Sequence, residues 1–172
     1  MTLFLVGYMG SGKSVIGKNL ARILEYNYTD LDDYIAQKEN ASIKVIFETK
    51  GEIYFRKIES LYLKELTKIE NTVVSLGGGT PCYGNNNNLI LESENSLSIY
   101  LKASIQTLSD RLFEEKSKRP LIAHLETKNE LSEFIGKHLF ERSLFYENST
   151  SIIKTDGLTE EEVVDNLIFE LF

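Results

Sequence analysis

The chain of 172 residues, with 42% hydrophobic and 26% charged residues, has the size and composition of one soluble globular domain. Its single cysteine, Cys82, excludes an internal disulfide framework, and its net charge of −7 argues against generic binding to nucleic acids or anionic membranes. The first apolar run, residues 3–6, is far too short to span a membrane and follows no basic segment, so we expect a cytoplasmic protein without a signal peptide.

Short apolar runs alternate along the chain with segments of helical periodicity, which is typical of an α/β domain with a parallel sheet. The runs that have the length of strands are residues 3–7, 27–30, 72–76, 97–101 and 151–154. The predicted helices are residues 13–24, 33–39, 42–49, 52–69, 130–146 and 159–171, with Gly51 ending the third and Thr159 capping the last. Gly84 and the four asparagines after it are predicted to form a turn, and we assign them no function.

A glycine-rich loop with the pattern Gly7-x4-Gly12-Lys13-Ser14 lies between the first strand and the first helix. Glycines at these positions let backbone N–H groups converge on phosphate oxygens, and the following helix adds the partial positive charge of its N-terminus. Lys13 is then expected to reach the β- and γ-phosphates, and the Ser14 hydroxyl to coordinate Mg²⁺. The alternative is a glycine-rich turn with an accidental lysine, but the flanking strand and helix favour a nucleotide-binding P-loop.

The rest of the chain narrows the class of P-loop protein. The guanine-reading pattern N-K-x-D of GTPases does not occur in the sequence, and the large motor ATPases need a longer chain. A small kinase that acts on a small molecule remains.

Two carboxylates, Asp30 and Asp32, stand at the carboxyl end of the second predicted strand, which is the edge where ligands bind in open α/β sheets. Such carboxylates hold Mg²⁺ through water or accept the proton of an attacking hydroxyl during phosphoryl transfer. The alternative is that Asp32 or Asp33 only caps the next helix, since aspartate is a favoured N-cap residue.

Three consecutive glycines, Gly77, Gly78 and Gly79, follow the third strand at the same edge. Their entropic cost favours a close approach of the main chain to a ligand over a simple tight turn. In the predicted helix 130–146, Arg142 lies within the apolar stripe, and an inward-facing arginine needs an anionic partner, either a protein carboxylate or a substrate. His138 shares that stripe and is interpreted as a packed, hydrogen-bonded residue.

Two further arginines have weaker signals when taken alone. Arg56 lies on the flank of an apolar helix face, where it can pair with Glu59. Arg119 precedes Pro120 in a charged segment, residues 114–128, that we interpret either as a solvated loop or as a mobile lid. An arginine that moves onto the phosphates with a lid would stabilise the transferred charge and exclude water.

Taken together, these residues resemble the shikimate kinase family of small P-loop kinases, over essentially the whole chain. The resemblance rests on the P-loop, Asp30-x-Asp32, Phe55-Arg56-x2-Glu59, the glycine triad, Arg119-Pro120-Leu121 and Arg142-x3-Tyr146, all in the order of the family. It implies a three-layer αβα sandwich with a five-stranded parallel sheet of order 2-3-1-4-5. It also implies transfer of the ATP γ-phosphoryl group to the 3-hydroxyl of shikimate, a step of aromatic amino-acid biosynthesis. The domain would comprise residues 1–172, with substrate-binding helices at about 33–60 and a lid at about 112–125.

The resemblance further implies residue roles. Lys13, Asp32 and Arg119 are expected to be catalytic, with Asp32 binding the acceptor hydroxyls and acting as a base, and Ser14 and Asp30 are expected at Mg²⁺. The residues implied for ATP are Gly10, Ser11, Gly12, Lys13, Ser14, Val15, Arg111 and Arg119, with the planar Arg111 against adenine. The residues implied for shikimate are Asp32, Phe55, Arg56, Gly77, Gly78, Gly79 and Arg142, with the two arginines clamping its carboxylate.

Other functions remain as alternatives. A polyol or acid kinase such as gluconate kinase shares the P-loop but should lack the set of Asp32, Arg56, Arg142 and the glycines. An adenylate kinase should have a longer lid with more arginines, and a non-catalytic ATP-binding module should have lost Lys13, Ser14, Asp32 or Arg119. The expected partners are ATP, Mg²⁺ and shikimate, with no nucleic acid and no membrane, and we expect a monomer.

Overall fold

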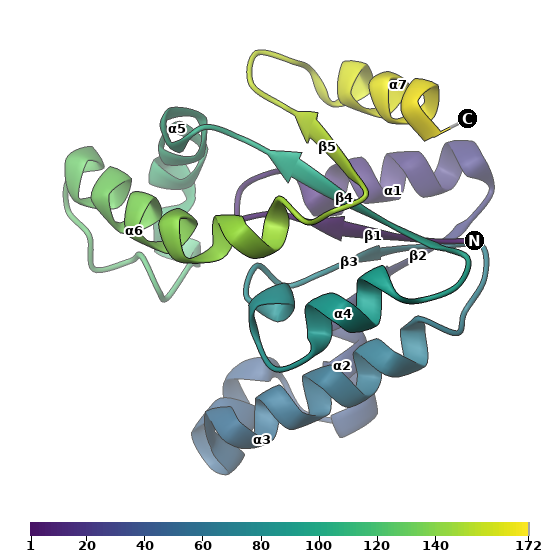
Figure 1. Ribbon diagram of the computed structural model, residues 1–172. Helices are drawn as coiled ribbons and strands as arrows, with labels where there is room; N and C mark the ends of the chain where they lie inside the picture. The colour runs from purple at the N-terminus through teal and green to yellow at the C-terminus, as the bar shows by residue number, and fades with distance from the viewer. Residues whose placement is uncertain (172) are drawn as a thin grey trace.

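The computed structural model describes residues 1–171, which fold around a five-stranded parallel sheet of order β2-β3-β1-β4-β5 (Figure 1). The strands are β1 (Thr2–Val6), β2 (Asn27–Asp30), β3 (Thr72–Ser75), β4 (Ser96–Lys102) and β5 (Ser151–Lys154). The predicted α/β class, strand order and flanking helices are therefore confirmed. No helix among the described residues is both long enough and apolar enough to cross a bilayer.

Helices cover both faces of the sheet. They are α1 (Lys13–Leu24), α2 (Leu31–Glu39), α3 (Ile43–Leu66), α4 (Asn86–Leu91), α5 (Ile105–Glu115), α6 (Lys128–Tyr146) and α7 (Glu160–Leu171), with the 3₁₀ turns η1 (Thr80–Cys82) and η2 (Lys116–Lys118). Helices α1 and α7 lie on one face, and the remaining helices lie on the other or beyond its edge (Figure 1). The layers are those of a three-layer sandwich.

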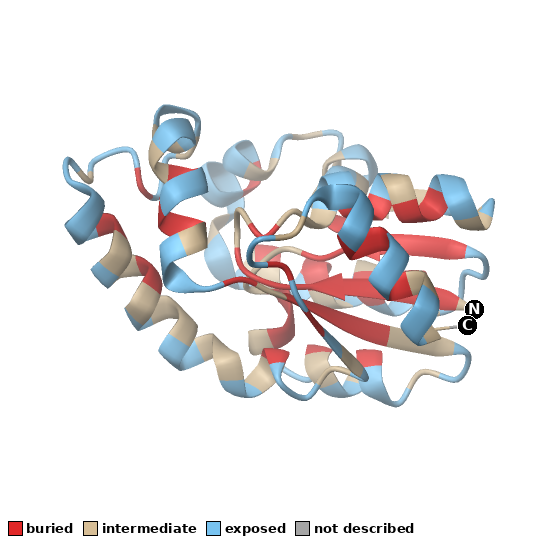
Figure 2. Cartoon of the chain, turned by 90° about the horizontal axis from the view of Figure 1, so that it is seen from above, coloured by how far each residue is buried: buried red, intermediate tan, exposed pale blue. Residues whose placement is uncertain are grey.

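Alternating side chains of the strands build the core on each face. Leu3 and Leu5 of β1 pack with α1 and α7, whereas Phe4 and Val6 pack with the helices of the opposite face. In Figure 2 the buried residues concentrate in the strands and on the helix surfaces that cover them. Because side chains on both faces of the sheet are buried, a strand such as β1 has a continuous apolar sequence.

The strand register brings the functional segments to one edge. Thr2 of β1 pairs with Thr72 of β3 and with Ser96 of β4, and Asp30 of β2 pairs with Ser75 of β3. Because all strands are parallel, the P-loop, the end of β2 and the glycine triad all follow strands that end at this edge.

The break in the long helix α3 occurs where the sequence predicts it. Gly51 has φ 81° and ψ 173°, a conformation that is almost confined to glycine, and Ser42 caps the helix by accepting a hydrogen bond from the N–H of Val45. Thr159 also caps α7 as predicted, because its hydroxyl accepts from the N–H of Glu162.

Two helices differ from the prediction. Residues 84–88 are expected to form a turn, but Asn86–Asn88 belong to helix α4, because the buried Asn86 donates to the carbonyl of Thr80 and Ile90 packs in the core. Helix α5 is absent from the predicted elements, although Ser104 caps it and Leu108 and Leu112 are buried one turn apart. The expected lid therefore starts inside a helix, since residues 112–115 belong to α5.

Candidate active site

The P-loop connects β1 to α1 and has the backbone conformation that its glycines permit. Gly10 and Gly12 have φ of +79° and +93°, and a Cβ atom at Gly10 would lie 2.9 Å from the side chain of Leu112. Gly12 provides no side-chain cap to α1, so the first N–H groups of that helix are available to an anion.

Lys13 bends back over this loop. Its ammonium donates to the carbonyl oxygens of Gly7 and Tyr8 at 2.8 and 2.9 Å. Burial lowers the pKa of Lys13 to about 8, although the nearby carboxylates of Asp30 and Asp32 oppose that shift. An anion that reaches Lys13 would raise this pKa again by favouring the charged form, and the loop is therefore suited to phosphate.

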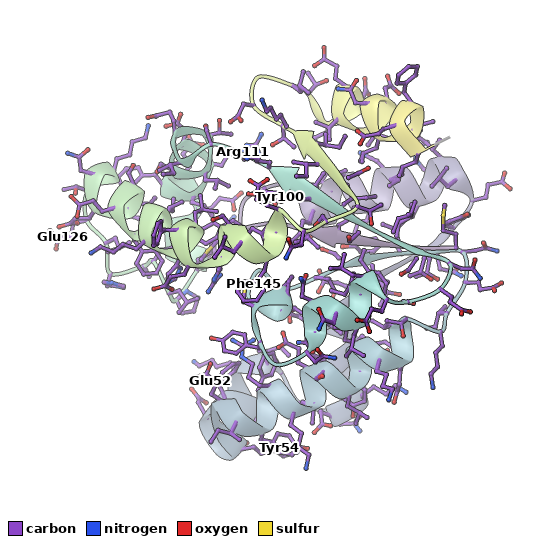
Figure 3. The ribbon with its side chains drawn as sticks, in the orientation of Figure 1. Glu52, Tyr54, Tyr100, Arg111, Glu126 and Phe145 are labelled. Atoms are coloured by element: carbon purple, nitrogen blue, oxygen red, sulfur yellow. The ribbon has the colours of Figure 1, made fainter. Side chains whose placement is uncertain are left out.

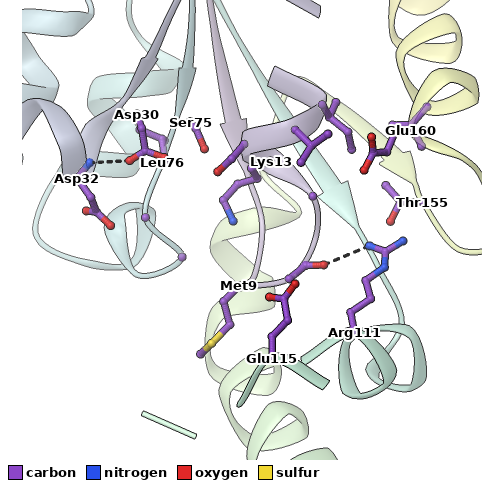
Figure 4. A pocket seen from close by; sticks show the side chains of 18 of the residues that line it. Met9, Lys13, Asp30, Asp32, Ser75, Leu76, Arg111, Glu115, Thr155 and Glu160 are labelled. Atoms are coloured by element: carbon purple, nitrogen blue, oxygen red, sulfur yellow. Dashed lines mark hydrogen bonds between the residues drawn. The ribbon is translucent and has the colours of Figure 1, made fainter. Parts of the chain in front are cut away.

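The loop forms one wall of a pocket of about 470 Å³ (Figure 4). The pocket brings together most of the residues predicted for ATP and metal: Gly10, Gly12, Lys13, Ser14, Val15, Asp30, Arg111 and Arg119, and with them Asp32, Gly77 and Gly78. Ser11 does not line the pocket, because its side chain is buried behind the loop near Gly7. Gly79, the last glycine of the triad, does not line the pocket, and neither do Phe55, Arg56 and Arg142.

The two aspartates at the end of β2 separate into a cap and a free carboxylate. Asp30 is the N-cap of α2, because its Oδ1 accepts from the N–H of Asp32 at 3.0 Å (Figure 4). The predicted alternative of a cap at Asp32 or Asp33 is thereby wrong. Burial, with the negative charges of Asp30 and Glu59, raises the pKa of Asp32 to about 6. A carboxylate with this pKa is poised to exchange a proton near neutral pH.

The glycine triad lies between Asp32 and the two arginines beyond the pocket. A Cβ atom at Gly77 would lie 3.4 Å from Oδ1 of Asp32, and one at Gly79 would lie 3.5 Å from both terminal nitrogens of Arg56. On the other side, a Cβ atom at Gly78 would lie 3.5 Å from Nη1 of Arg142. The absence of side chains on this loop therefore leaves room for a small anion that contacts the main chain and both guanidinium groups.

Each arginine is held by a network of its own. Nη1 of Arg56 donates to Oε2 of Glu59 at 2.9 Å, and the buried Glu59 also accepts from the hydroxyl of Thr80 at 2.7 Å. The sequence predicts the pair of Arg56 and Glu59, but it does not predict the contact that ties Glu59 to the glycine loop. Phe55 is buried, with its ring centroid 4.5 Å from that of Phe47.

Arg142 comes from α6 and lies over the ring of Tyr8, with Cζ 5.7 Å from the ring centroid. The hydroxyl of Tyr8 and Nδ1 of His138 share a hydrogen bond of 2.9 Å, so the prediction of His138 as a packed, hydrogen-bonded residue is confirmed. One turn beyond Arg142, the buried Tyr146 donates to the carbonyl oxygen of Gly78. Helix α6 is thus fastened to the P-loop and to the glycine triad.

Two arginines approach the pocket from the side of α5. Nη1 of Arg111 donates to the carbonyl oxygen of Gly10 at 3.2 Å (Figure 4). Arg119 has the extended backbone predicted before proline, and its guanidinium donates to Glu115 at 3.0 Å. Glu115 is a pocket residue that sequence reasoning missed, although it lies one helical turn before Arg119.

The P-loop, the carboxylate of Asp32, the glycine triad and the pair Arg56 and Arg142 therefore lie together at one edge of the sheet. We compared the chain with known protein families, sequences and solved structures. A family model described as shikimate kinase matches residues 9–171. A shikimate kinase of Flavobacterium johnsoniae is 48% identical over 167 residues, which cover 96% of each chain.

Solved structures agree. The structure of shikimate kinase from Bacteroides thetaiotaomicron superimposes with a TM-score of 0.90 at 33% identity and covers 99% of both chains. Shikimate kinase from Acinetobacter baumannii in complex with shikimate gives a TM-score of 0.85 at 28% identity, covering 99% of this chain and 92% of that one.

Proposed function

This chain belongs to the shikimate kinase family, and from that premise we propose how its residues transfer the γ-phosphoryl group of ATP to the 3-hydroxyl of shikimate. The enzyme is a phosphotransferase with an alcohol acceptor and ATP as its co-substrate. The observation that carries the proposal is that Asp32 faces both sites, since it lines the pocket of Lys13 and adjoins the glycine triad.

ATP occupies the pocket behind the P-loop. The N–H groups of residues 10–15 surround its phosphates, and Lys13 exchanges its two carbonyl acceptors for the β- and γ-phosphates. Arg111 lies against the adenine, for which a planar guanidinium is suited. The support for this placement is that all of these residues except Ser11 line one continuous pocket.

Mg²⁺ fits the same pocket. Ser14 and Asp30 offer oxygen ligands, and burial raises the pKa of the Asp30 carboxyl group, a cost that a divalent cation would offset. Residues 1–171 contain no cluster of three or more histidine, cysteine or carboxylate ligands, and Mg²⁺ needs none when substrate phosphates complete its shell. Mg²⁺ supplies charge neutralisation on the phosphates, and Ser14 and Asp30 hold it.

Catalysis proceeds by positioning and charge. Asp32 accepts the hydrogen bond of the 3-hydroxyl and orients this oxygen toward the γ-phosphorus; as the new O–P bond forms and the bond to the leaving ADP oxygen breaks, Asp32 takes the hydroxyl proton. As negative charge grows on the transferred group, Lys13 and Arg119 stabilise it. Arg119 reaches the phosphates when the segment of about residues 112–125 closes, and the same closure excludes water that would otherwise hydrolyse ATP.

The acceptor is held on the far side of the glycine triad. Arg56 and Arg142 bind the carboxylate of shikimate, while the backbone of residues 77–79 and the ring of Phe55 form the wall against its ring. The support for this placement is that both guanidinium groups lie beside adjacent glycines of the triad, 3.5 Å from the Cβ positions of Gly78 and Gly79.

We test the substrate by measuring ADP production from ATP and Mg²⁺ with shikimate, quinate, gluconate or AMP. Stimulation by shikimate alone is the expected result. Stimulation by gluconate would favour a polyol kinase, and slow hydrolysis that no acceptor stimulates would mean that the arginine pair binds no acceptor.

We further propose that residues 1–172 form one domain and act as a cytoplasmic monomer with no nucleic-acid or membrane partner. The net charge of −7 supports the absence of a nucleic-acid or anionic-membrane partner. Sedimentation of the purified protein gives the oligomeric state directly.

A further inference from the structure

Tyr83 covers the guanidinium group of Arg56. This tyrosine follows the turn η1, directly after the glycine triad, and its ring centroid lies 3.6 Å from Cζ of Arg56. A Cβ atom at Gly79 would lie 3.4 Å from Cε2 of Tyr83, so ring, guanidinium and glycine form one contact cluster. Tyr83 as a whole residue is 38% exposed, and among residues 1–171 its hydroxyl makes no hydrogen bond to another side chain or to the main chain.

The other contacts of Arg56 leave part of its donor set unused. Nη1 of Arg56 pairs with Oε2 of Glu59 at 2.9 Å, whereas Nε of Arg56 lies 3.5 Å from Oε1 of Glu52. Nε is buried and has no hydrogen-bond partner among the described residues. With Tyr83 against one face of the guanidinium, a ligand must approach the free donors in the plane of the group.

A stacked ring restrains an arginine differently from a carboxylate. Glu59 fixes one nitrogen but also offsets the positive charge, whereas an aromatic face holds the whole plane and leaves the net charge intact. Restraint of a flexible side chain before binding removes part of the entropic cost that the ligand would otherwise pay.

We propose that Tyr83 is a positioning residue for the acceptor, which orients the guanidinium plane of Arg56 so that its free donors meet a carboxylate edge-on. The inference rests on the proposed role of Arg56 in binding the carboxylate of shikimate. It assigns Tyr83 to recognition of the acid and leaves ATP binding and the transfer step to other residues.

The test compares Tyr83→Leu with Tyr83→Phe. Leucine keeps apolar bulk but has no aromatic face, so we expect KM for shikimate to rise about 3- to 30-fold, the range of a cation–π contact, while KM for ATP and kcat stay within twofold. Phenylalanine keeps the face and should leave KM for shikimate within twofold of wild type. Titration of shikimate by calorimetry without nucleotide should give the same ranking.

Tyr54→Leu is the matched control. Tyr54 also contacts a cation, with Nζ of Lys50 4.4 Å from its ring centroid, but Figure 3 shows it at the rim of α3, away from the site. We expect the Tyr54→Leu variant to differ from wild type in thermal stability but to have an unchanged KM for shikimate. A rise in KM for shikimate in Tyr54→Leu equal to that in Tyr83→Leu would overturn the proposal, because a general loosening of α3 would then explain both.

The Arg56→Ala variant separates this inference from the proposed function. If Arg56→Ala raises KM for shikimate and Tyr83→Leu does not, the role of Tyr83 is wrong while the clamp stands. If Arg56→Ala leaves KM for shikimate unchanged, the clamp itself is wrong. In the double variant, Tyr83→Leu should add less than a twofold further change, and an undiminished effect there would overturn the proposal.

Discussion

At the scale of single residues, Asp30 and Asp32 show how two neighbouring carboxylates acquire different tasks. Asp30 satisfies an N–H group at the start of α2, which fixes its geometry. Asp32 belongs to the same helical turn but points into the pocket, where burial raises its pKa to about 6. The ionised form of Asp32 is therefore a source of instability in the protein without ligands.

Replacement of Asp32 by asparagine should abolish activity and raise the free energy of unfolding. The pKa of Asp32 is raised on folding from 3.8 to about 6, so the folded protein binds this proton more tightly, and stability is lost as pH rises through that interval. Asp32→Asn should therefore abolish turnover, keep ATP binding, and gain about 1–3 kcal/mol of stability at pH 7.5. Urea unfolding measures the gain, which should vanish below about pH 4. Equal stability of both proteins at pH 7.5 would contradict the prediction.

The pH dependence of turnover should be bell-shaped. With both substrates below their KM values, the rate reports the free enzyme, in which Asp32 must be ionised and Lys13 protonated. The rate should therefore fall below about pH 6 and above about pH 8. Stopped-time ADP assays from pH 5 to 9.5 measure the profile. In Lys13→Arg the basic limb should disappear, because arginine keeps its proton, and a persistent fall near pH 8 would refute the assignment to Lys13.

At the scale of elements, segments with strong periodicity are predictable, and segments that depend on distant contacts are not. The strands, α1 and the break at Gly51 follow from local pattern and from one backbone conformation. Helix α4 does not, because its asparagines favour turns in isolation and become helical only where Asn86 is buried against Thr80.

The candidate site divides in the same way. The P-loop and the glycine triad are recognisable because their chemistry needs fixed residue types at fixed spacing. The contact of Glu59 with Thr80 and that of Tyr83 with Arg56 are not, because each joins residues that lie more than twenty positions apart along the chain. The pairing of Glu115 with Arg119 is predictable from their spacing of four residues, but only once residues 112–115 are recognised as helical.

The ion pair between Glu115 and Arg119 should oppose closure of the lid segment. Arg119 must leave Glu115 to reach the phosphates, and an exposed pair of this kind is worth at most about 1 kcal/mol. Glu115→Gln should therefore lower KM for ATP by up to about fivefold and leave KM for shikimate unchanged. Glu114→Gln removes an adjacent exposed charge that forms no ion pair among residues 1–171, and it should have no such effect. An equal fall in both variants would indicate a general charge effect.

At the scale of the whole molecule, the site joins elements that are far apart in the chain. Arg56 comes from α3 and Arg142 from α6, and the loop after β3 lies between them. A ligand that bridges these parts adds contacts that the unfolded chain lacks, so binding stabilises the entire fold.

Thermal unfolding should therefore distinguish the two substrates. Shikimate at about 100 times its Kd should add about 2.7 kcal/mol, which for a chain of this length raises Tm by about 5–10 °C. Arg142→Ala should reduce that shift to near zero while an ATP analogue still raises Tm by the wild-type amount. Differential scanning fluorimetry measures both shifts, and loss of the ATP-dependent shift alone would contradict the role given to Arg142.

The position of β1 in the sheet bears on how the acceptor specificity of such an enzyme can change. Strands β3 and β2 lie on one side of β1, with the glycine triad and Asp32 at their ends, while β4 and β5 on its other side lead to Arg111 and Thr155 of the nucleotide pocket. The P-loop, which follows β1, lies between these two sides of the sheet. Because Arg142 of the proposed acceptor site comes from α6, which lies between β4 and β5 in the chain, and because Asp32 also lines the nucleotide pocket, a change of acceptor specificity is expected to need substitutions on both sides of β1.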